Sequence, residues 1–263
     1  MSRRIPLGRL GLGAVALFGV LLFALPLVGL LLRTPWGSLV GLLQEPAVRS
    51  AMGLSLQSSG LALLLAAALG LPMAVWLANG RSWLRTAARI VVMLPIVLPP
   101  VTAGIALLLA FGRNGVVGVW LAEWFGVTIP FTTFATVVAA AYMGMPFFVL
   151  SVEAGLRGFD RRYLDVAATL GAGPLRRFVT VTLPMVLPSL RTGALLCWAR
   201  ALGEYCATQT FAGNLEGTTR TMPLACGVAM ETQPDIAVAL SVILVSVSVG
   251  VLFVLRNGLG GSR

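Results

Sequence analysis

Long runs of apolar residues constrain the fold of this sequence more than any other feature. A helix needs roughly 20 apolar residues to cross a hydrocarbon core of about 30 Å. Six stretches come close to this length, namely residues 10–32, 54–78, 90–111, 131–152, 192–211 and 236–255. Because lipid offers the backbone no hydrogen-bond partners, each stretch is expected to be helical. The sequence therefore predicts an all-α, polytopic membrane protein with one transmembrane domain over residues 1–263 and six transmembrane helices.

The first apolar stretch follows a short basic segment, as the core of a cleaved secretory signal does. The basic residues are Arg3, Arg4 and Arg9. However, residues 10–32 form a longer run than the roughly 7–15 residues of a signal core, and no clear cleavage site follows them. We therefore expect this stretch to be retained as the first span.

The distribution of arginine predicts the orientation in the membrane. With the N-terminus in the cytoplasm, most arginines fall on the cytoplasmic side, and these are Arg3, Arg4, Arg9, Arg81, Arg85, Arg89, Arg157, Arg161, Arg162, Arg176, Arg177, Arg191, Arg256 and Arg263. The arginines that then lie outside are Arg33, Arg49, Arg113 and Arg220. Cytoplasmic loops are enriched in Lys and Arg, so both termini are expected in the cytoplasm. The same rule explains the net charge of +10 without a nucleic-acid partner.

The composition excludes several kinds of chemistry. The chain has neither lysine nor histidine, whereas a phosphate-binding loop needs its lysine and zinc-protease or triad chemistry usually needs imidazole. Any ATP hydrolysis must then take place on another subunit. Cys197, Cys206 and Cys226 lack the spacing of metal ligands, and we interpret them as small packing residues. We expect no catalytic residue, no metal and no cofactor.

One predicted loop carries far more charge than the rest of the chain. It comprises residues 153–191, between the fourth and fifth spans, and contains Asp160, Arg161, Arg162, Asp165, Arg176 and Arg177. Apolar residues recur in it at the three- and four-residue spacing of an amphipathic helix, and these are Phe159, Tyr163, Val166, Ala167 and Leu170. We expect the loop to fold as a cytoplasmic element in water.

Glycine and proline predict a sharp corner in the middle of this loop. Gly171 stands where a left-handed cap would end the first helix, and Pro174 suits the first turn of a second helix. Pro184 and Pro188 are expected to end that second helix before the fifth span begins. The loop either packs against its own bundle as an amphipathic surface element or docks the corner at residues 171–173 into a soluble partner. The periodicity leaves both interpretations open.

The segments from Asp165 to Gly171 and from Val181 to Pro184 resemble the signature loop of bacterial ABC importer permeases. The family pattern is Glu-Ala-Ala, three residues, Gly, nine residues and Ile-x-Leu-Pro. In this chain Asp165, Val166 and Val181 replace the Glu, the first Ala and the Ile. The resemblance implies a coupling helix that seats in a groove on an ATP-binding subunit. The residues that it assigns to coupling are Asp165, Ala167, Ala168, Gly171, Ala172, Gly173, Val181, Leu183 and Pro184.

The resemblance also implies a set of partners and a location. These are two ATP-binding cassette subunits, a second copy of the chain and an extracytoplasmic oxyanion-binding protein, assembled in the bacterial inner membrane. Nucleotide-driven closure of the ATP-binding subunits would rock the membrane helices.

A second region resembles the permeases for molybdate, tungstate and sulfate. The similarity comprises residues 198–205 and 207–214, and residues 217–223 are more similar to the molybdate type than to sulfate permeases. Cys206 and Gln209 depart from that pattern. The resemblance implies a permease for a tetrahedral oxyanion, with molybdate favoured and with tungstate and sulfate as alternatives.

Two charges interrupt the fifth predicted span. Arg200 and Glu204 lie four residues apart, so we expect them on one face of the helix and within pairing distance. They either form a structural ion pair or lie beside the translocation path, where the arginine would offset the charge of an anion. Thr208 and Thr210 are candidates for an outer gate, although hydroxyl groups in helices also bond to backbone carbonyls.

Prolines and a short apolar segment add two further expectations. Pro95, Pro99 and Pro100 predict a kink in the third span. The segment from Met222 to Met230 is too short to cross the membrane, so we expect a re-entrant or surface segment.

Two other functional classes compete with an importer. A gradient-driven transporter would use Glu204 as its ion site but would not need the charged loop. An intramembrane enzyme would need clustered catalytic groups that the spans lack.

Overall fold

The computed structural model describes residues 7–80, 82–160 and 162–259, and the regular elements of these residues are all helical. The predicted cytoplasmic residues Arg3, Arg4, Arg81, Arg161 and Arg263 lie outside the described residues. In chain order the elements are α1 (Leu7–Arg33), α2 (Leu39–Gln44), α3 (Pro46–Ala78), α4 (Trp83–Val97), α5 (Pro100–Phe111), α6 (Gly118–Phe125), α7 (Thr133–Gly158), α8 (Arg162–Thr169), α9 (Pro174–Arg177), the π-helix η1 (Phe178–Thr182), α10 (Leu183–Leu202), α11 (Cys206–Ala212), α12 (Met222–Thr232) and α13 (Pro234–Leu259).

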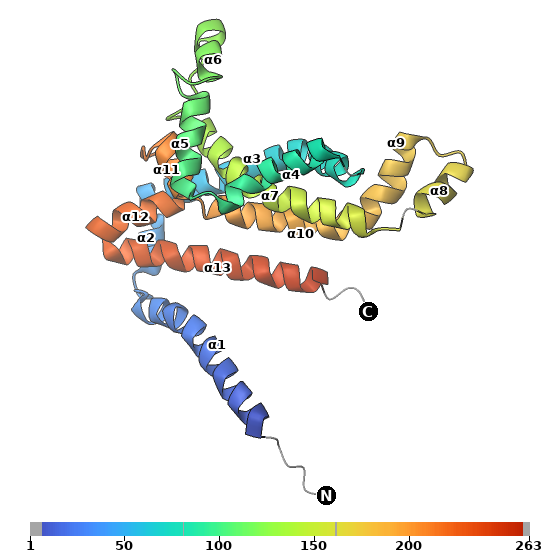
Figure 1. Cartoon of the computed structure of the whole chain (residues 1–263). Coiled ribbons are helices and arrows are strands. Elements are labelled where there is room, and N and C mark those ends of the chain that lie inside the picture. Colours follow the sequence, from blue (N-terminus) through green and yellow to red (C-terminus); the bar gives the residue numbers. More distant parts are fainter. Residues whose placement is uncertain (1–6, 81, 161, 260–263) are drawn as a thin grey trace, which may run out of the picture.

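Five helical stretches of the described chain are long and apolar enough to cross a membrane. They are Leu12–Arg33, Pro46–Ala78, Thr133–Gly158, Pro174–Leu202 and Pro234–Val254. The prediction of an all-helical polytopic protein is confirmed, whereas the third of the six predicted spans is not among these five long helices. The stretch at residues 90–111 is divided into α4 and α5, which run in different directions (Figure 1).

The division between α4 and α5 has its cause in consecutive prolines. Leu98 and Pro99 both have extended backbone angles, with ψ of 139° and 131°. A proline disfavours helical geometry in the residue before it and cannot donate a backbone hydrogen bond. The predicted kink is therefore a complete break at Pro99, whereas Pro95 lies within the unbroken α4.

The fifth span begins and ends earlier than predicted. Pro184 and Pro188 do not end a helix, because the helical stretch runs without a gap from Pro174 to Leu202. In the π-helical turn η1, the N–H of Leu183 donates to the carbonyl of Phe178. This wider turn accommodates Pro184 at the start of α10, where a missing N–H is tolerated. At the other end, the predicted boundary at residue 211 is wrong, since α10 stops at Leu202.

The bundle is built around α3, α7 and α10, which lie side by side (Figure 1). Their shared core consists of Ala66, Ala74, Leu77, Phe148, Val149, Val152, Leu156, Val186 and Cys197. Small residues allow a close approach, since a Cβ atom on Gly144 would lie 2.8 Å from the backbone oxygen of Cys197. Helices in lipid associate through such tight packing rather than through the hydrophobic effect. These three helices therefore form the compact part of the molecule.

The remaining long helices are attached more loosely. α13 packs with α12 and α2 around Val48, Met222, Ala229, Ile236, Ala237 and Leu240. α1 extends away from the other helices (Figure 1). None of its most apolar window is buried, and Phe23 is 84% exposed.

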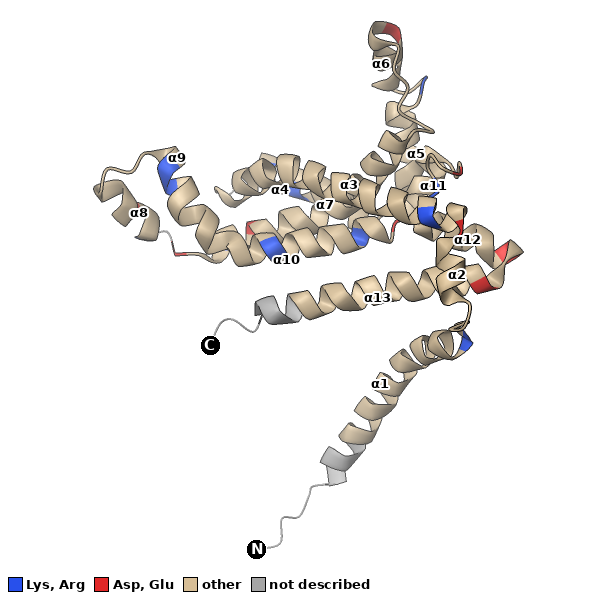
Figure 2. Cartoon of the chain, turned by 180° about the vertical axis from the view of Figure 1, so that it is seen from behind, with Lys and Arg blue, Asp and Glu red and all other residues tan. Residues whose placement is uncertain are grey.

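Charge is concentrated at the two ends of the bundle, as Figure 2 shows. We call the end that carries α8 and α9 the loop end, and the end that carries α2 and α12 the opposite end. Arginines gather at the loop end, and these include Arg85, Arg89, Arg157, Arg176 and Arg177. Glu231 and Asp235 lie at the opposite end.

Candidate functional site

The loop between α7 and α10 contains the predicted corner. Gly171 adopts a left-handed conformation with φ of 76°. Its N–H donates to the carbonyl of Ala168 at 3.0 Å, and the N–H of Ala172 donates to the carbonyl of Ala167 at 3.0 Å. These two bonds form a Schellman motif, which satisfies carbonyls at the end of α8. α9 then begins at Pro174, so the predicted helix–corner–helix is present.

The apolar stripe on α8 faces away from the bundle. The exposed apolar side chains of the corner region are Tyr163, Val166, Leu170, Leu175 and Val179. Leu170 has a fully apolar side chain and is nevertheless 82% exposed. α8 and α9 also project beyond the ends of the three core helices (Figure 1). An exposed apolar patch on a projecting element is typical of a docking surface for another protein.

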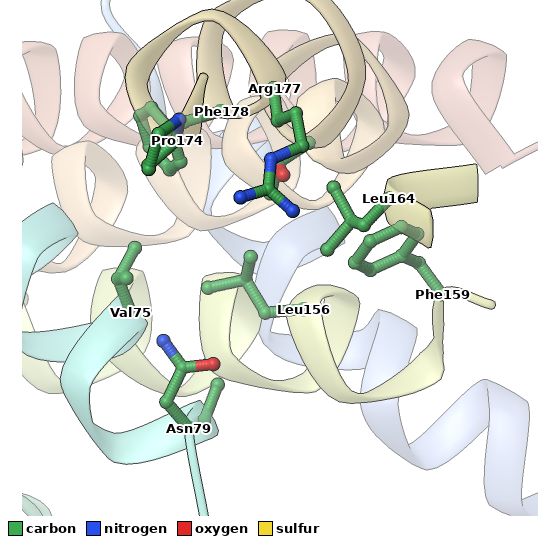
Figure 3. A pocket seen from close by; sticks show the side chains of 10 residues that line it. Val75, Asn79, Leu156, Phe159, Leu164, Pro174, Arg177 and Phe178 are labelled. Atoms are coloured by element: carbon green, nitrogen blue, oxygen red, sulfur yellow. The ribbon is translucent and has the colours of Figure 1, made fainter. Parts of the chain in front are cut away.

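The other face of α8 turns toward the bundle. Leu164 lines a cavity of about 230 Å³ between the loop and the bundle, together with Val75, Ala78, Asn79, Leu156, Phe159, Pro174, Arg177, Phe178 and Thr182. Figure 3 shows Leu164 close to Leu156 and Phe159, with the guanidinium of Arg177 directed into the cavity. The last turn of α7 therefore lies directly beneath the loop.

The predicted coupling residues fall into two groups. Asp165, Ala167, Ala168 and the corner at residues 171–173 lie together on the projecting part of the loop. Val181, Leu183 and Pro184 lie elsewhere, in η1 and the first turn of α10. These three residues therefore do not lie at the tip of the loop.

The second candidate site is the break between α10 and α11. Glu204 lies outside both helices and is 3% exposed, so the expectation that it shares a helical face with Arg200 is wrong. The predicted pair nevertheless forms, with 2.5 Å between Nη1 of Arg200 and Oε2 of Glu204. Oε1 of Glu204 accepts a hydrogen bond from the N–H of Ala207 at 2.8 Å. One carboxylate thus pairs with α10 and caps the start of α11.

The two candidate gate threonines lie on α11. Thr208 is 2% exposed, and the hydroxyl of Thr210 donates to the carbonyl of Cys206 at 2.8 Å. α11 packs closely on α5, since a Cβ atom on Gly104 would lie 2.7 Å from Cβ of Thr210. Both threonines are therefore engaged within the protein in this structure.

The sequence reasoning missed a buried ion cluster at the loop end. Glu153 was expected in a water-exposed loop, but it lies in α7 and is 4% exposed. It pairs with Arg89 and Arg157. The four-residue spacing from Glu153 to Arg157 was the available signal, whereas Arg89 is far away in the sequence.

The segment from Met222 to Met230 lies within the helix α12 at the opposite end. In the part of the chain that the structure describes, no three His, Cys, Asp or Glu residues are placed to hold a metal ion.

Comparison with known proteins identifies a family for most of the chain. Residues 66–256 match the family described as binding-protein-dependent transport system inner membrane component. The chain is 43% identical over 233 residues to the molybdenum transport system permease protein ModB of Mycobacterium tuberculosis, covering 89% of this chain and 88% of that protein. It is 41% identical over 165 residues to the protein of the same name from Escherichia coli K12, covering 63% of this chain and 72% of that protein.

The fold also matches solved structures. A bacterial ABC transporter involved in the import of the acidic polysaccharide alginate superimposes with a TM-score of 0.73 at 18% identity, covering 97% of this chain and 98% of that chain. The same kind of transporter in complex with an alginate pentasaccharide-bound periplasmic protein gives a TM-score of 0.72 at 18% identity, covering 94% and 93%. At this identity the likeness concerns the fold.

The pair between Arg200 and Glu204 should contribute more to stability than an exposed pair. We expect Glu204→Ala to lower the free energy of unfolding by about 3 kcal/mol, because it leaves a partly buried arginine without its partner and removes the cap of α11. Glu216→Ala is the matched control, since Glu216 pairs with Arg220 at the same spacing but is 60% exposed. Thermal unfolding in detergent measures both variants. Equal losses would contradict this account of the break.

Proposed function

The chain belongs to the family of binding-protein-dependent transport system inner membrane components, and from this premise we propose that it is the permease subunit of an ATP-driven importer for molybdate. It is a polytopic inner-membrane transport component and not itself the ATPase. The system to which such a chain belongs also includes an ATPase and a binding protein. The observation that carries the proposal is the projecting corner at Gly171 in a chain of this family.

The α8–α9 loop is the site where we expect the ATP-binding subunit to dock. Three observations support this role. The corner is held by two backbone hydrogen bonds, its apolar side chains are exposed, and its stem continues into α10 as one helical stretch. A displacement of the corner would therefore be passed directly to a membrane helix.

The anion would pass near the break after α10. Of the two paired charges at this break, Arg200 is the more exposed, because 28% of its side chain is accessible. Its positive charge would offset the charge of the anion, and Glu204 would prevent tight retention. The same pairing argues against Glu204 as the ion site of a gradient-driven transporter, because its carboxylate is already engaged by Arg200 and Ala207. Thr208 and Thr210 adjoin this region on α11 and remain the candidates for its gate.

The assembly would contain two copies of the chain and two ATP-binding subunits. The exposed apolar window of α1 and the small number of helices in one chain support a dimer, since closed twofold assemblies are the commonest oligomers. We place the loop end and both termini in the cytoplasm, because most arginines of the chain lie there and cytoplasmic loops are enriched in arginine. An extracytoplasmic oxyanion-binding protein would then meet the opposite end, where α2 and α12 lie.

Substrate identity is tested by uptake. Proteoliposomes that contain the chain, its ATP-binding subunit and its binding protein should accumulate molybdate only when ATP is supplied. Tungstate should compete strongly because it has the same charge and nearly the same size, whereas the smaller sulfate should compete weakly. Dominant competition by sulfate would reassign the substrate. Uptake that persists without ATP under an ion gradient would contradict an ATP-driven importer.

The corner is tested by changing its left-handed residue. Gly171→Val should weaken association with the ATP-binding subunit by roughly 5- to 30-fold, because a side chain costs about 1–2 kcal/mol in that conformation. Gly158→Val is the control, since a Cβ atom there would meet nothing within 4 Å and the residue does not have a positive φ. Titration of the purified subunits measures both affinities. An unchanged affinity for Gly171→Val would remove the corner from the interface.

The path is tested with variants that remove a charge and keep a polar side chain. Arg200→Gln should lower the uptake rate roughly tenfold, as expected for a loss of about 1.4 kcal/mol in the stabilisation of the passing anion. Glu216→Gln, an exposed change at the opposite end, should leave uptake unchanged. Normal uptake by both Arg200→Gln and Glu204→Gln, in complexes that assemble and hydrolyse ATP, would exclude a role in the path.

A further inference from the structure

Glu153 joins three helices at the loop end of the bundle. Its carboxylate accepts from Nε of Arg89 at 3.1 and 3.2 Å and also from Nη2 of the same guanidinium. Nε of Arg157 lies 2.9 Å from Oε1 of Glu153. Both arginines further donate to the carbonyl of Leu77, Arg157 at 3.1 Å and Arg89 at 3.4 Å. The cluster thus ties α4 and α7 to the end of α3.

The carboxylate at the centre of the cluster is buried, and the geometry of its bonds is specific. Only 5% of the Glu153 side chain is exposed, and Arg89 presents two nitrogens to it. Charge-assisted bonds that use the fork of an arginine fix relative orientation as well as distance. Separating a buried carboxylate from its partners costs free energy of folding. The link between Arg89 and Glu153 therefore holds the first turns of α4 against α7.

The cluster lies between the loop and the segment that reaches the break after α10. On one side, Leu156 and Phe159 at the end of α7 line the cavity beneath α8. On the other side, α4 leads through the break at Pro99 into α5, and Gly104 of α5 packs on Ala207 and Thr210 of α11. A series of neighbouring elements therefore leads from the loop to α11 by way of Glu153, through the shared cavity, the ion cluster and the connected helices α4 and α5.

We propose that Glu153 is a positioning residue for transport, which makes the segment α4–α5 move with the end of α7 when the loop is displaced. Through α5 the displacement reaches α11 and the break that holds Glu204. The inference rests on the proposed function, because it assumes that an ATP-binding subunit displaces the loop. It assigns to the buried cluster a role in coupling that is separate from stabilising the bundle.

The decisive variant removes the link while preserving the packing. Arg89→Met with Glu153→Leu replaces the buried pair by apolar side chains of similar size, a change that is often neutral for stability. Glu153→Gln, with the outline of the natural side chain, is the second probe. Arg157→Gln is the matched control, because it removes a charge from the same cluster but keeps the bond between Arg89 and Glu153. All variants are assembled with the ATP-binding subunit and the binding protein in proteoliposomes.

The readout is molybdate taken up per ATP hydrolysed, with thermal unfolding measured in parallel. We expect the double variant and Glu153→Gln to hydrolyse ATP but to transport roughly 2- to 30-fold less molybdate per ATP. Changes of about this size are typical of residues that affect the coupling between two sites without contacting a ligand. Arg157→Gln should retain the natural ratio.

An unchanged ratio in either link variant that assembles would overturn the proposal and leave Glu153 a structural role only. A ratio that falls only in proportion to lost thermal stability would overturn it as well. Failure of the natural chain to import at all would instead contradict the proposed function, so the two failures are distinguishable.

Discussion

The structure depends on the need to satisfy every polar backbone group in a molecule that lies largely in lipid. A helix pairs its own backbone groups except where it is interrupted. At each interruption in this chain, a freed N–H group finds a different partner. The carboxylate of Glu204 accepts the N–H of Ala207 after α10 ends. At the π-helical turn the N–H of Leu183 reaches the carbonyl of Phe178. At the proline break the N–H of Ala103 donates to the carbonyl of Pro99. Part of the backbone freed at each of these breaks is therefore paired within the protein.

These breaks divide the molecule into a compact bundle and attached segments. The three core helices α3, α7 and α10 pack through small residues and leave little room for rearrangement. The segments α4–α5, α8–α9 and α11 lie at or next to the breaks and meet the bundle through fewer side chains. Movement between two arrangements of a membrane transporter is largely rigid-body, so we expect it to occur at these joints. The two buried carboxylates, Glu153 and Glu204, each lie at one of them.

Hydropathy predicted the helical membrane fold because its signal is local, and glycine with proline predicted the corner at Gly171 for the same reason. Local signals failed where distant contacts decide the outcome. A charge usually ends a span, which favours a position in water for Glu153. Its partner Arg89, 64 residues away in the sequence, instead holds it inside the bundle. Pro184 was expected to end a helix, but a widened turn before it absorbs the missing N–H. The capping role of Glu204 could not be predicted from the sequence, because it depends on the break between α10 and α11.

The central claim is that the corner of the α8–α9 loop is the contact with a separate ATP-hydrolysing subunit. Leu170 is the apolar side chain most exposed there, at 82%, so a cysteine at this position can be linked chemically to a neighbouring protein. Leu170→Cys, treated in intact membranes with a short reagent that reacts with a thiol at one end and an amine at the other, should form one cross-linked product with the ATP-binding subunit. That product should change in yield when ATP is added. A cysteine that reacts only with reagents applied from the extracytoplasmic side, or that never links to that subunit, would contradict the account.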